Sequence, residues 1–380
     1  MTPVVPDAVQ TERRLSQILQ RDSANVGVGS SMDRLTVMLT RSCELRCSYC
    51  FVAVTDEGHG RDQAGKTPSG VPLGDIAPAT LNAAIDLLMR SPRPRLALQL
   101  FGGEPTRRWD LLSGGITYAI EHPARAGRSL ELLLTTNGLG LDAAVEGQAG
   151  RLAHLRAPEV VVELSFDGDA RGSRFRRGHL LKTEAVSASL ERQIPALIDS
   201  GVKFFVNATL PPAAAEEVEE RYHWARSLGV PALQLNYATG MSWTPAQAKS
   251  YLVGLQRVLL HHHANPGKLQ LLNWHNGADP VPLCGDVIID VDGSILQMGG
   301  VFHEKRFPAL RAAYARGDVH QAQTFAGLRI SLDELWKLTQ ETLGPEDWSV
   351  FAENVRFGAA VDLVVQFTRR RLGLDAKRAS

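Results

Sequence analysis

The sequence predicts an α/β fold: a partial (β/α)6 barrel of parallel strands, followed by a C-terminal α+β extension. Three observations predict it. Strand-like and helix-like segments alternate over residues 33–240. Several of these strands are unbroken apolar runs, such as Val160-Val161-Val162, which are typical of a parallel sheet covered by helices. A full eightfold barrel needs roughly 250 residues, so six strand–helix pairs indicate an incomplete one.

The expected strands are short apolar segments at residues 34–39, 95–101, 130–135, 160–166, 202–210 and 232–237. The expected helices follow these strands at residues 78–90, 110–121, 141–155, 183–199, 213–228 and 244–263. We therefore divide the chain into an N-terminal segment (1–32), the barrel (33–240) and the extension (241–380).

Two stretches interrupt the alternation. Residues 55–78 are rich in Gly, Pro and polar side chains, and a loop of this length is often a lid over an active site. Residues 286–298 read as a hairpin, because the turn pair Asp292-Gly293 separates two apolar runs. Two helices, at residues 331–342 and 345–372, are expected to close the chain.

Composition excludes several classes of protein. The chain has 380 residues, of which 44% are hydrophobic and 22% charged, as in globular proteins. Lys+Arg and Asp+Glu both number 41, so we expect neither nucleic acid nor an anionic membrane as a partner. No signal peptide and no apolar run of membrane-spanning length is present. The expected location is the cytoplasm, where cysteines are reduced or bind metal.

The four cysteines are unevenly distributed, at positions 43, 47, 50 and 284. Three lie on one short loop that follows the first strand, and this is not the spacing of core residues. Three thiolates can hold three corners of a cubane iron–sulfur cluster. Zinc competes with this interpretation, although a structural zinc site needs a fourth ligand such as Cys284 or a distant histidine. Both interpretations remain open on the cysteines alone.

The loop Cys43-Glu-Leu-Arg-Cys47-Ser-Tyr49-Cys50 resembles the Cys-x3-Cys-x-aromatic-Cys signature of the radical S-adenosylmethionine (radical SAM) superfamily. Further resemblances end the second, third and fourth strands in the family's order: Gly102-Gly103-Glu104-Pro105, Thr135-Thr136-Asn137-Gly138 and Ser165-Phe166-Asp167-Gly168. All these motifs fall at carboxyl ends of parallel strands, where such folds place ligand sites.

The resemblance implies one [4Fe–4S] cluster on Cys43, Cys47 and Cys50, with a fourth iron chelated by the amino and carboxylate groups of SAM. It implies that Gly102 and Gly103 let the backbone approach the methionine amino group. Glu104 would fix that loop or accept a hydrogen bond from the ammonium group.

The resemblance also implies contacts with the rest of SAM. Thr136 and Asn137 would lie near its sulfonium or ribose, and Ser165 and Asp167 would accept from the ribose hydroxyls. Tyr49 would pack near adenine. An arginine after the fourth strand would pair with the SAM carboxylate, with Arg177 the first choice and Arg174 the second.

The segment around Cys284 resembles the SPASM or twitch extension of peptide-modifying radical SAM enzymes. It reads Cys284-Gly285, an apolar strand, Asp292-Gly293 and then Met298, near where a second cysteine would stand. We therefore expect a degenerate extension without an auxiliary cluster. Cys284 is then a buried remnant that packs as a small hydrophobe, a thiol that returns a hydrogen atom to substrate, or another contact with substrate or metal.

The resemblance implies reductive cleavage of SAM to a 5′-deoxyadenosyl radical, which abstracts hydrogen from an unactivated carbon. The expected substrate is a ribosomally synthesised peptide. The expected protein partners are an electron donor such as flavodoxin or ferredoxin and a separate leader-peptide-binding protein. One alternative is a small-molecule intermediate, including epimerisation assisted by the Cys284 thiol. The other is a non-catalytic protein that binds zinc or a cluster.

Overall fold

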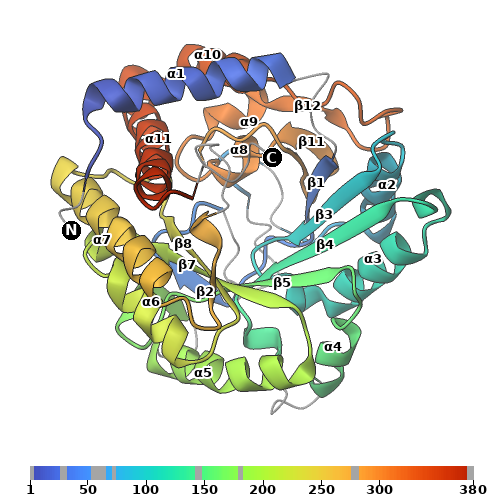
Figure 1. Ribbon diagram of the computed structural model, residues 1–380. Helices are drawn as coiled ribbons and strands as arrows, with labels where there is room; N and C mark the ends of the chain where they lie inside the picture. The colour runs from blue at the N-terminus through green and yellow to red at the C-terminus, as the bar shows by residue number, and fades with distance from the viewer. Residues whose placement is uncertain are drawn as a thin grey trace.

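A ten-stranded, mostly parallel sheet organises the described part of the molecule, and Figure 1 looks along the barrel that it forms. The computed structural model describes residues 4–25, 32–52, 66–70, 74–141, 148–178, 183–274 and 282–374. The strand order is β12-β11-β10-β1-β3-β4-β5-β7-β8-β9. The run from β10 to β9 is parallel throughout.

The predicted alternation of strands and helices is confirmed. The first six barrel strands are β1 (Met32–Met38), β3 (Arg95–Phe101), β4 (Ser129–Thr136), β5 (Val160–Ser165), β7 (Phe204–Leu210) and β8 (Ala232–Tyr237). The helices outside them are α2 (Pro78–Met89), α3 (Trp109–Glu121), α4 (Ala149–His154), α5 (Thr183–Ser200), α6 (Val218–Ser227) and α7 (Pro245–Ala264). A seventh parallel strand, β9 (Gln270–Leu271), extends the sheet beyond β8.

The element ends follow local chemistry. Thr244 begins α7 with a reciprocal capping box to Gln247, and a proline follows at the first helical position. The expected helix over 213–228 begins later, at Val218, because a 3-10 turn at Pro212–Ala214 precedes it. The helix expected over 141–155 is described only as α4, and residues 142–147 lie outside the described part.

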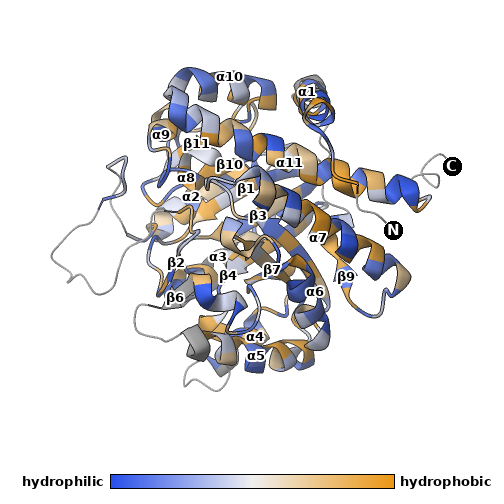
Figure 2. Ribbon diagram, turned by 90° about the vertical axis from the view of Figure 1, so that its left-hand side faces the viewer, coloured by the Kyte–Doolittle hydropathy of each residue, from blue (hydrophilic) through white to orange (hydrophobic). Residues whose placement is uncertain are grey.

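The N-terminal segment contains a helix that the sequence analysis missed. Helix α1 (Ala8–Asn25) buries Leu15 and Ile18 in a cluster with residues of the last two helices, α10 (Leu332–Thr342) and α11 (Pro345–Arg371). Figure 2 shows α1 at the same end of the molecule as these helices. The spacing of Leu15, Ile18 and Leu19 was the available signal, since residues three or four apart share one helix face.

The predicted hairpin is confirmed and becomes part of the sheet. Strands β10 (Val287–Ile289) and β11 (Ser294–Gln297) are antiparallel, and β10 pairs in parallel with β1. Strand β12 (Ala315–Asp318) pairs with the outer side of β11. The N-terminal strand of the barrel is therefore flanked by a strand from the last third of the chain.

Helix α11 packs against the open side of the barrel. The hydroxyl of Tyr237, at the end of β8, donates to the carbonyl oxygen of Asn354 at 3.2 Å. The ring centroid of Phe357 lies 4.6 Å from that of Tyr237 and 4.8 Å from that of Trp243. The two helices predicted to close the chain are confirmed, and the second of them lines the barrel interior.

Within the described residues, no helix is long and apolar enough to cross a membrane. The proposed lid over 55–78 falls largely outside the described part, which contains only residues 66–70 and 74–78 of it. The latter piece is tied down, because Thr40 and Asp75 form an isolated β-bridge beside the cysteine loop.

Candidate functional site

The cysteine loop follows β1 and folds on itself. The backbone N–H of Leu45 donates to the Cys43 Sγ at 3.3 Å, and that of Cys50 donates to the Cys47 carbonyl at 3.0 Å. A separate two-stranded sheet holds the loop in place. In it, β2 (Leu45–Cys47) runs antiparallel to β6 (Arg176–Gly178). Cys43 is buried, whereas Cys47 and Cys50 are partly exposed.

Burial, with the carboxylates of Glu44 and Glu104 nearby, raises the pKa of the Cys43 thiol well above its ordinary range. Such a thiol stays protonated at neutral pH unless a bound metal displaces the proton. Within the described residues, no three His, Cys, Asp or Glu side chains are placed to hold a single metal ion. In a cubane cluster, by contrast, each cysteine binds a different iron.

Two glycines let the second strand end dock against the cysteine loop. The N–H of Gly103 donates to the Thr40 carbonyl at 2.7 Å, and the N–H of Glu104 donates to the Ser42 carbonyl at 2.8 Å. A Cβ on Gly102 would lie 2.6 Å from the Thr40 carbonyl oxygen, and one on Gly103 would lie 2.5 Å from the Ser42 carbonyl oxygen. Only glycine allows this approach. The predicted contact of both glycines with SAM stays a prediction.

Glu104 ties the second and third strand ends together. Its Oε1 accepts from the Thr106 N–H at 3.0 Å and from the hydroxyls of Thr106 and Thr136, each at 2.6 Å. Its Oε2 accepts from the Asn137 N–H at 2.6 Å. Burial, reinforced by Glu44, raises the pKa of Glu104 to about 7. Of the two expected roles, this geometry is that of a loop-fixing carboxylate.

The third and fourth strand ends are also held by their polar residues. Asn137 donates from Nδ2 to Glu44 Oε1 at 3.0 Å, and this joins the third strand end to the cysteine loop. Buried Asp167 accepts from the Tyr49 hydroxyl and from the Thr209 N–H, the latter at 3.0 Å. Tyr49 therefore bridges the cysteine loop and the fourth strand end. Ser165 ends β5 on the same edge.

Of the two arginines proposed for the SAM carboxylate, the structure describes the side chain of Arg174 but only the backbone of Arg177. Arg174 makes a bidentate ion pair with Glu217, at 3.0 and 2.7 Å, and its guanidinium stacks on Phe175. The backbone of Arg177 pairs with Arg46 between two of the cysteines, whereas its side chain lies outside the described part. The choice between them stays a prediction.

A buried ion network joins the cysteine loop to the C-terminal hairpin. Arg41, two residues before Cys43, pairs with Asp290 at 2.6 Å and with Glu304 at 2.9 Å. Arg311 also pairs with Asp290, at 2.5 Å. Burial opposes ionisation of Asp290, but the two arginines hold its pKa below the ordinary value. The Lys305 ammonium adds a 3.3 Å bond to the Cys50 carbonyl. The sequence analysis missed this network, because its members are far apart in the chain.

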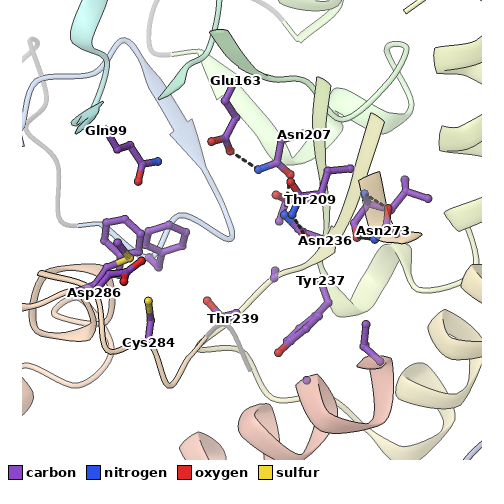
Figure 3. Close-up of a pocket in the computed structure, with 18 of the residues that line it drawn as sticks. Gln99, Glu163, Asn207, Thr209, Asn236, Tyr237, Thr239, Asn273, Cys284 and Asp286 are labelled. Carbon is purple, nitrogen blue, oxygen red and sulfur yellow. Dashed lines mark hydrogen bonds between the residues drawn. The ribbon is translucent and has the colours of Figure 1, made fainter. Parts of the chain in front are cut away.

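The barrel interior contains a cavity of about 860 Å³. Figure 3 shows part of its wall, with Glu163, Asn207 and Asn236 on the barrel strands and Cys284 and Asp286 on the segment before β10. Cys284 is half-buried and lines the cavity. Its functional role stays a prediction.

Polar side chains cross the interior face of the sheet in a chain of hydrogen bonds that the sequence analysis also missed. Its members come from six strands: Thr36, Gln99, Thr135, Glu163, Asn207, Asn236 and Gln234. The available signal was a polar residue at an inward position in each apolar strand, since side chains in a strand alternate between its faces.

The folds of several solved proteins are similar. The structure of anSMEcpe with bound AdoMet and Kp18Cys peptide matches with a TM-score of 0.65 and 13% identity, covering 89% of this chain and 99% of that one. Streptococcus suis SuiB bound to S-adenosylmethionine matches with a TM-score of 0.52 and 11% identity, covering 91% and 72%. No family model and no curated protein sequence matches. At these identities the likeness shows the fold alone.

Proposed function

We propose that this protein is a radical SAM enzyme that modifies a peptide. The observation that carries the proposal is the joining of four motif loops at one edge of the sheet. Backbone hydrogen bonds join Gly103 and Glu104 to the cysteine loop, and the Glu104 carboxylate accepts hydrogen bonds from Thr136 and Asn137. Tyr49 joins the same loop to Asp167. These contacts make the four sequence motifs into one structural unit.

The donor set fits an iron–sulfur cluster. Cys43, Cys47 and Cys50 would hold it, and the edge of the sheet at Gly102 and Ser165 would receive SAM. When bound, the cluster would supply the electron that cleaves SAM to methionine and a 5′-deoxyadenosyl radical. The chain's own contribution is to position SAM and substrate and to exclude water. A flavodoxin or ferredoxin is the proposed electron donor.

The proposed substrate is a ribosomally synthesised peptide. Support comes from the anSMEcpe structure, whose name records a bound peptide, and from a cavity large enough for a side chain with its neighbouring backbone. A separate protein would present the leader segment of that peptide. The runner-up is a small-molecule intermediate, which the same cavity would also hold.

Anaerobic reconstitution tests the proposal. The protein is loaded with iron and sulfide, and its iron content and visible absorption are measured. SAM and dithionite are then added, and 5′-deoxyadenosine is quantified. Broad iron–sulfur absorption with 5′-deoxyadenosine release supports the enzyme. A colourless protein that carries stoichiometric zinc and leaves SAM intact supports the non-catalytic alternative instead.

A second candidate reaction, epimerisation, is favoured by the position of Cys284 in the cavity wall. Its S–H would return a hydrogen atom to the substrate radical. The sulfur radical left behind would take one electron from the electron donor and one proton from water. Turnover in deuterated water tests this role. Deuterium at an inverted carbon, lost in Cys284→Ala, supports it, and unchanged incorporation in the variant rejects it.

A further inference from the structure

The cavity contains a carboxylate that the proposed cofactor site does not use. Glu163 lies on β5, two residues before Ser165, and therefore points to the same side of the sheet, one layer deeper in the barrel. It lines the cavity, and Figure 3 shows its side chain directed toward Asn207 on the neighbouring strand β7.

Two arms of hydrogen bonds converge on Glu163. In the first arm, Gln234 donates to Asn236 at 3.3 Å, Asn236 donates to Asn207 at 2.9 Å, and Asn207 donates to Glu163 Oε1. Every donor in this arm is directed toward the carboxylate. Such a chain polarises each successive bond in the same sense and stabilises negative charge at its end.

The second arm lies on the same face of the sheet and reaches Glu163 from its other neighbouring strand, β4. Thr36 donates to Gln99 at 3.0 Å, Gln99 donates to Thr135 at 2.9 Å, and Thr135 donates to Glu163 Oε2 at 3.0 Å. Glu163 is thus the common acceptor of both arms, and side chains from five other strands orient donors toward its carboxylate.

The Glu163 carboxyl group has no cationic partner within the part of the chain that the structure describes. No ion pair includes Glu163, and its hydrogen bonds come from neutral side chains. Burial raises the pKa of Glu163, and the bonds from Asn207 and Thr135 oppose that rise. A carboxylate in a partly buried position without a counter-charge is unfavourable, and a bound cation would relieve this penalty.

A second acceptor lies in the same cavity wall. The buried imidazole of His303 donates to the Pro282 carbonyl, and burial lowers its pKa to about 4, so the ring is neutral. Its Nδ1 has no hydrogen-bond partner among the described residues. In the neutral ring with the other nitrogen donating, Nδ1 is an acceptor. The cavity wall thus includes Glu163 and this neutral acceptor. It also includes two arginines and three further acidic residues: Arg34, Arg329, Glu131, Asp286 and Asp362.

We propose that Glu163 binds a cationic nitrogen group of the substrate, an ammonium or a guanidinium. In a peptide this group is the side chain of Lys or Arg near the modified residue. The inference deepens the proposed function and rests on the cavity being the substrate site. The cofactor edge and this subsite are then one residue layer apart, with Ser165 above and Glu163 below.

Four capped amino acids test the inference as probes of the SAM-loaded, reconstituted protein. They are the N-acetyl methylamides of lysine, arginine, norleucine and glutamate, and dissociation constants are measured by ligand-detected NMR. Because a hydrogen bond to a charged group is stronger than one between neutral groups, the lysine or arginine probe should bind at least about tenfold more tightly than norleucine. The glutamate probe should bind most weakly. Equal binding of the cationic and norleucine probes overturns the proposal, and this comparison needs no variant.

The variant Glu163→Gln tests whether Glu163 is the residue that causes the preference for cationic probes. The variant should bind the cationic and norleucine probes equally, whereas Glu131→Gln should keep the wild-type preference. Glu131 is the matched control, because it lines the same cavity but is exposed. A preference retained in Glu163→Gln overturns the assignment to Glu163. So does a loss of SAM affinity in this variant without a change in probe preference, since that result would place Glu163 on the cofactor.

The proposed function has a separate readout. If wild-type protein fails to release 5′-deoxyadenosine, the enzymatic proposal fails regardless of which probes bind. If SAM is cleaved but the cationic probes show no preference, only the assignment of the cationic subsite fails.

Discussion

The guanidinium of Arg41 lies 2.6 Å from the carboxylate of Asp290, and both side chains are completely buried. These residues are 249 positions apart in the sequence. Their ion pair therefore fixes the start of the cysteine loop to the hairpin of the C-terminal extension. The position of the loop depends on the extension as well as on the barrel.

Arg41→Met should destabilise the protein strongly, because it removes a cation from the buried carboxylates of Asp290 and Glu304. Breaking a buried pair in this way costs about 3–5 kcal/mol. Urea unfolding of the protein before cluster loading measures the loss. Arg356→Met, which breaks the exposed pair with Glu12, is the control and should cost under about 1 kcal/mol. Equal losses in the two variants would contradict a structural role for the network.

Gly103→Ala should displace the cysteine loop, because the added methyl group would meet the Ser42 carbonyl at 2.5 Å. Overpacking of this kind costs about 1–3 kcal/mol and shifts backbone. We expect a several-fold lower iron content after reconstitution. Gly114→Ala is the control, since a Cβ there has no neighbour within 4 Å in helix α3. Normal iron content in Gly103→Ala would show that the close approach is dispensable.

Glu104→Gln should weaken the junction of the strand ends. The carboxylate accepts backbone N–H groups on both oxygens, so the amide NH2 of glutamine would have to face one of these donors. One buried mismatch costs about 1–3 kcal/mol in the free energy of unfolding. Glu131→Gln changes the same chemistry at an exposed position and should stay within about 0.5 kcal/mol of wild type. Similar unfolding free energies for both variants would contradict this account of Glu104.

His303 should make stability depend on pH below neutrality. Burial lowers its pKa from the ordinary 6.5 to about 4, so between these values the unfolded chain binds a proton that the folded chain does not. Stability contributed by the neutral ring is complete above pH 6.5 and falls as the pH drops toward 4. From pH 7 to pH 5, wild type should lose about 2 kcal/mol more than His303→Leu. If the unfolding free energies of wild type and His303→Leu depend on pH in the same way, His303 does not have a lowered pKa in the folded protein.

The barrel and its motif edge were predictable because their signals are local. The alternation of strands and helices can be recognised from apolar runs such as residues 160–162. The motif loops can be recognised from glycines at strand ends, such as Gly102-Gly103. The hairpin after Cys284 was predictable from its Asp-Gly turn for the same reason. These features depend on residues that are neighbours in the sequence.

The parts that were missed depend on contacts between distant segments. Arg and Asp are residue types usually found at the surface, so the sequence gives no sign that Arg41 and Asp290 are buried. Only the parallel pairing of β1 with β10 brings them together. Glu163 similarly gains its significance from Asn207 and Thr135 on neighbouring strands. Helix α1 was missed because most of its residues are polar and its apolar face, around Leu15 and Ile18, is narrow.

The pairing of β1 with β10 also constrains the order of folding. During synthesis, β1 emerges early, whereas its neighbour and the acidic partners of Arg41 emerge only after most of the chain is made. Until then Arg41 must stay hydrated and one edge of β1 unpaired, and such an edge invites intermolecular association. We therefore expect chains truncated before residue 287 to aggregate, and refolding of the intact chain to be limited by this long-range closure.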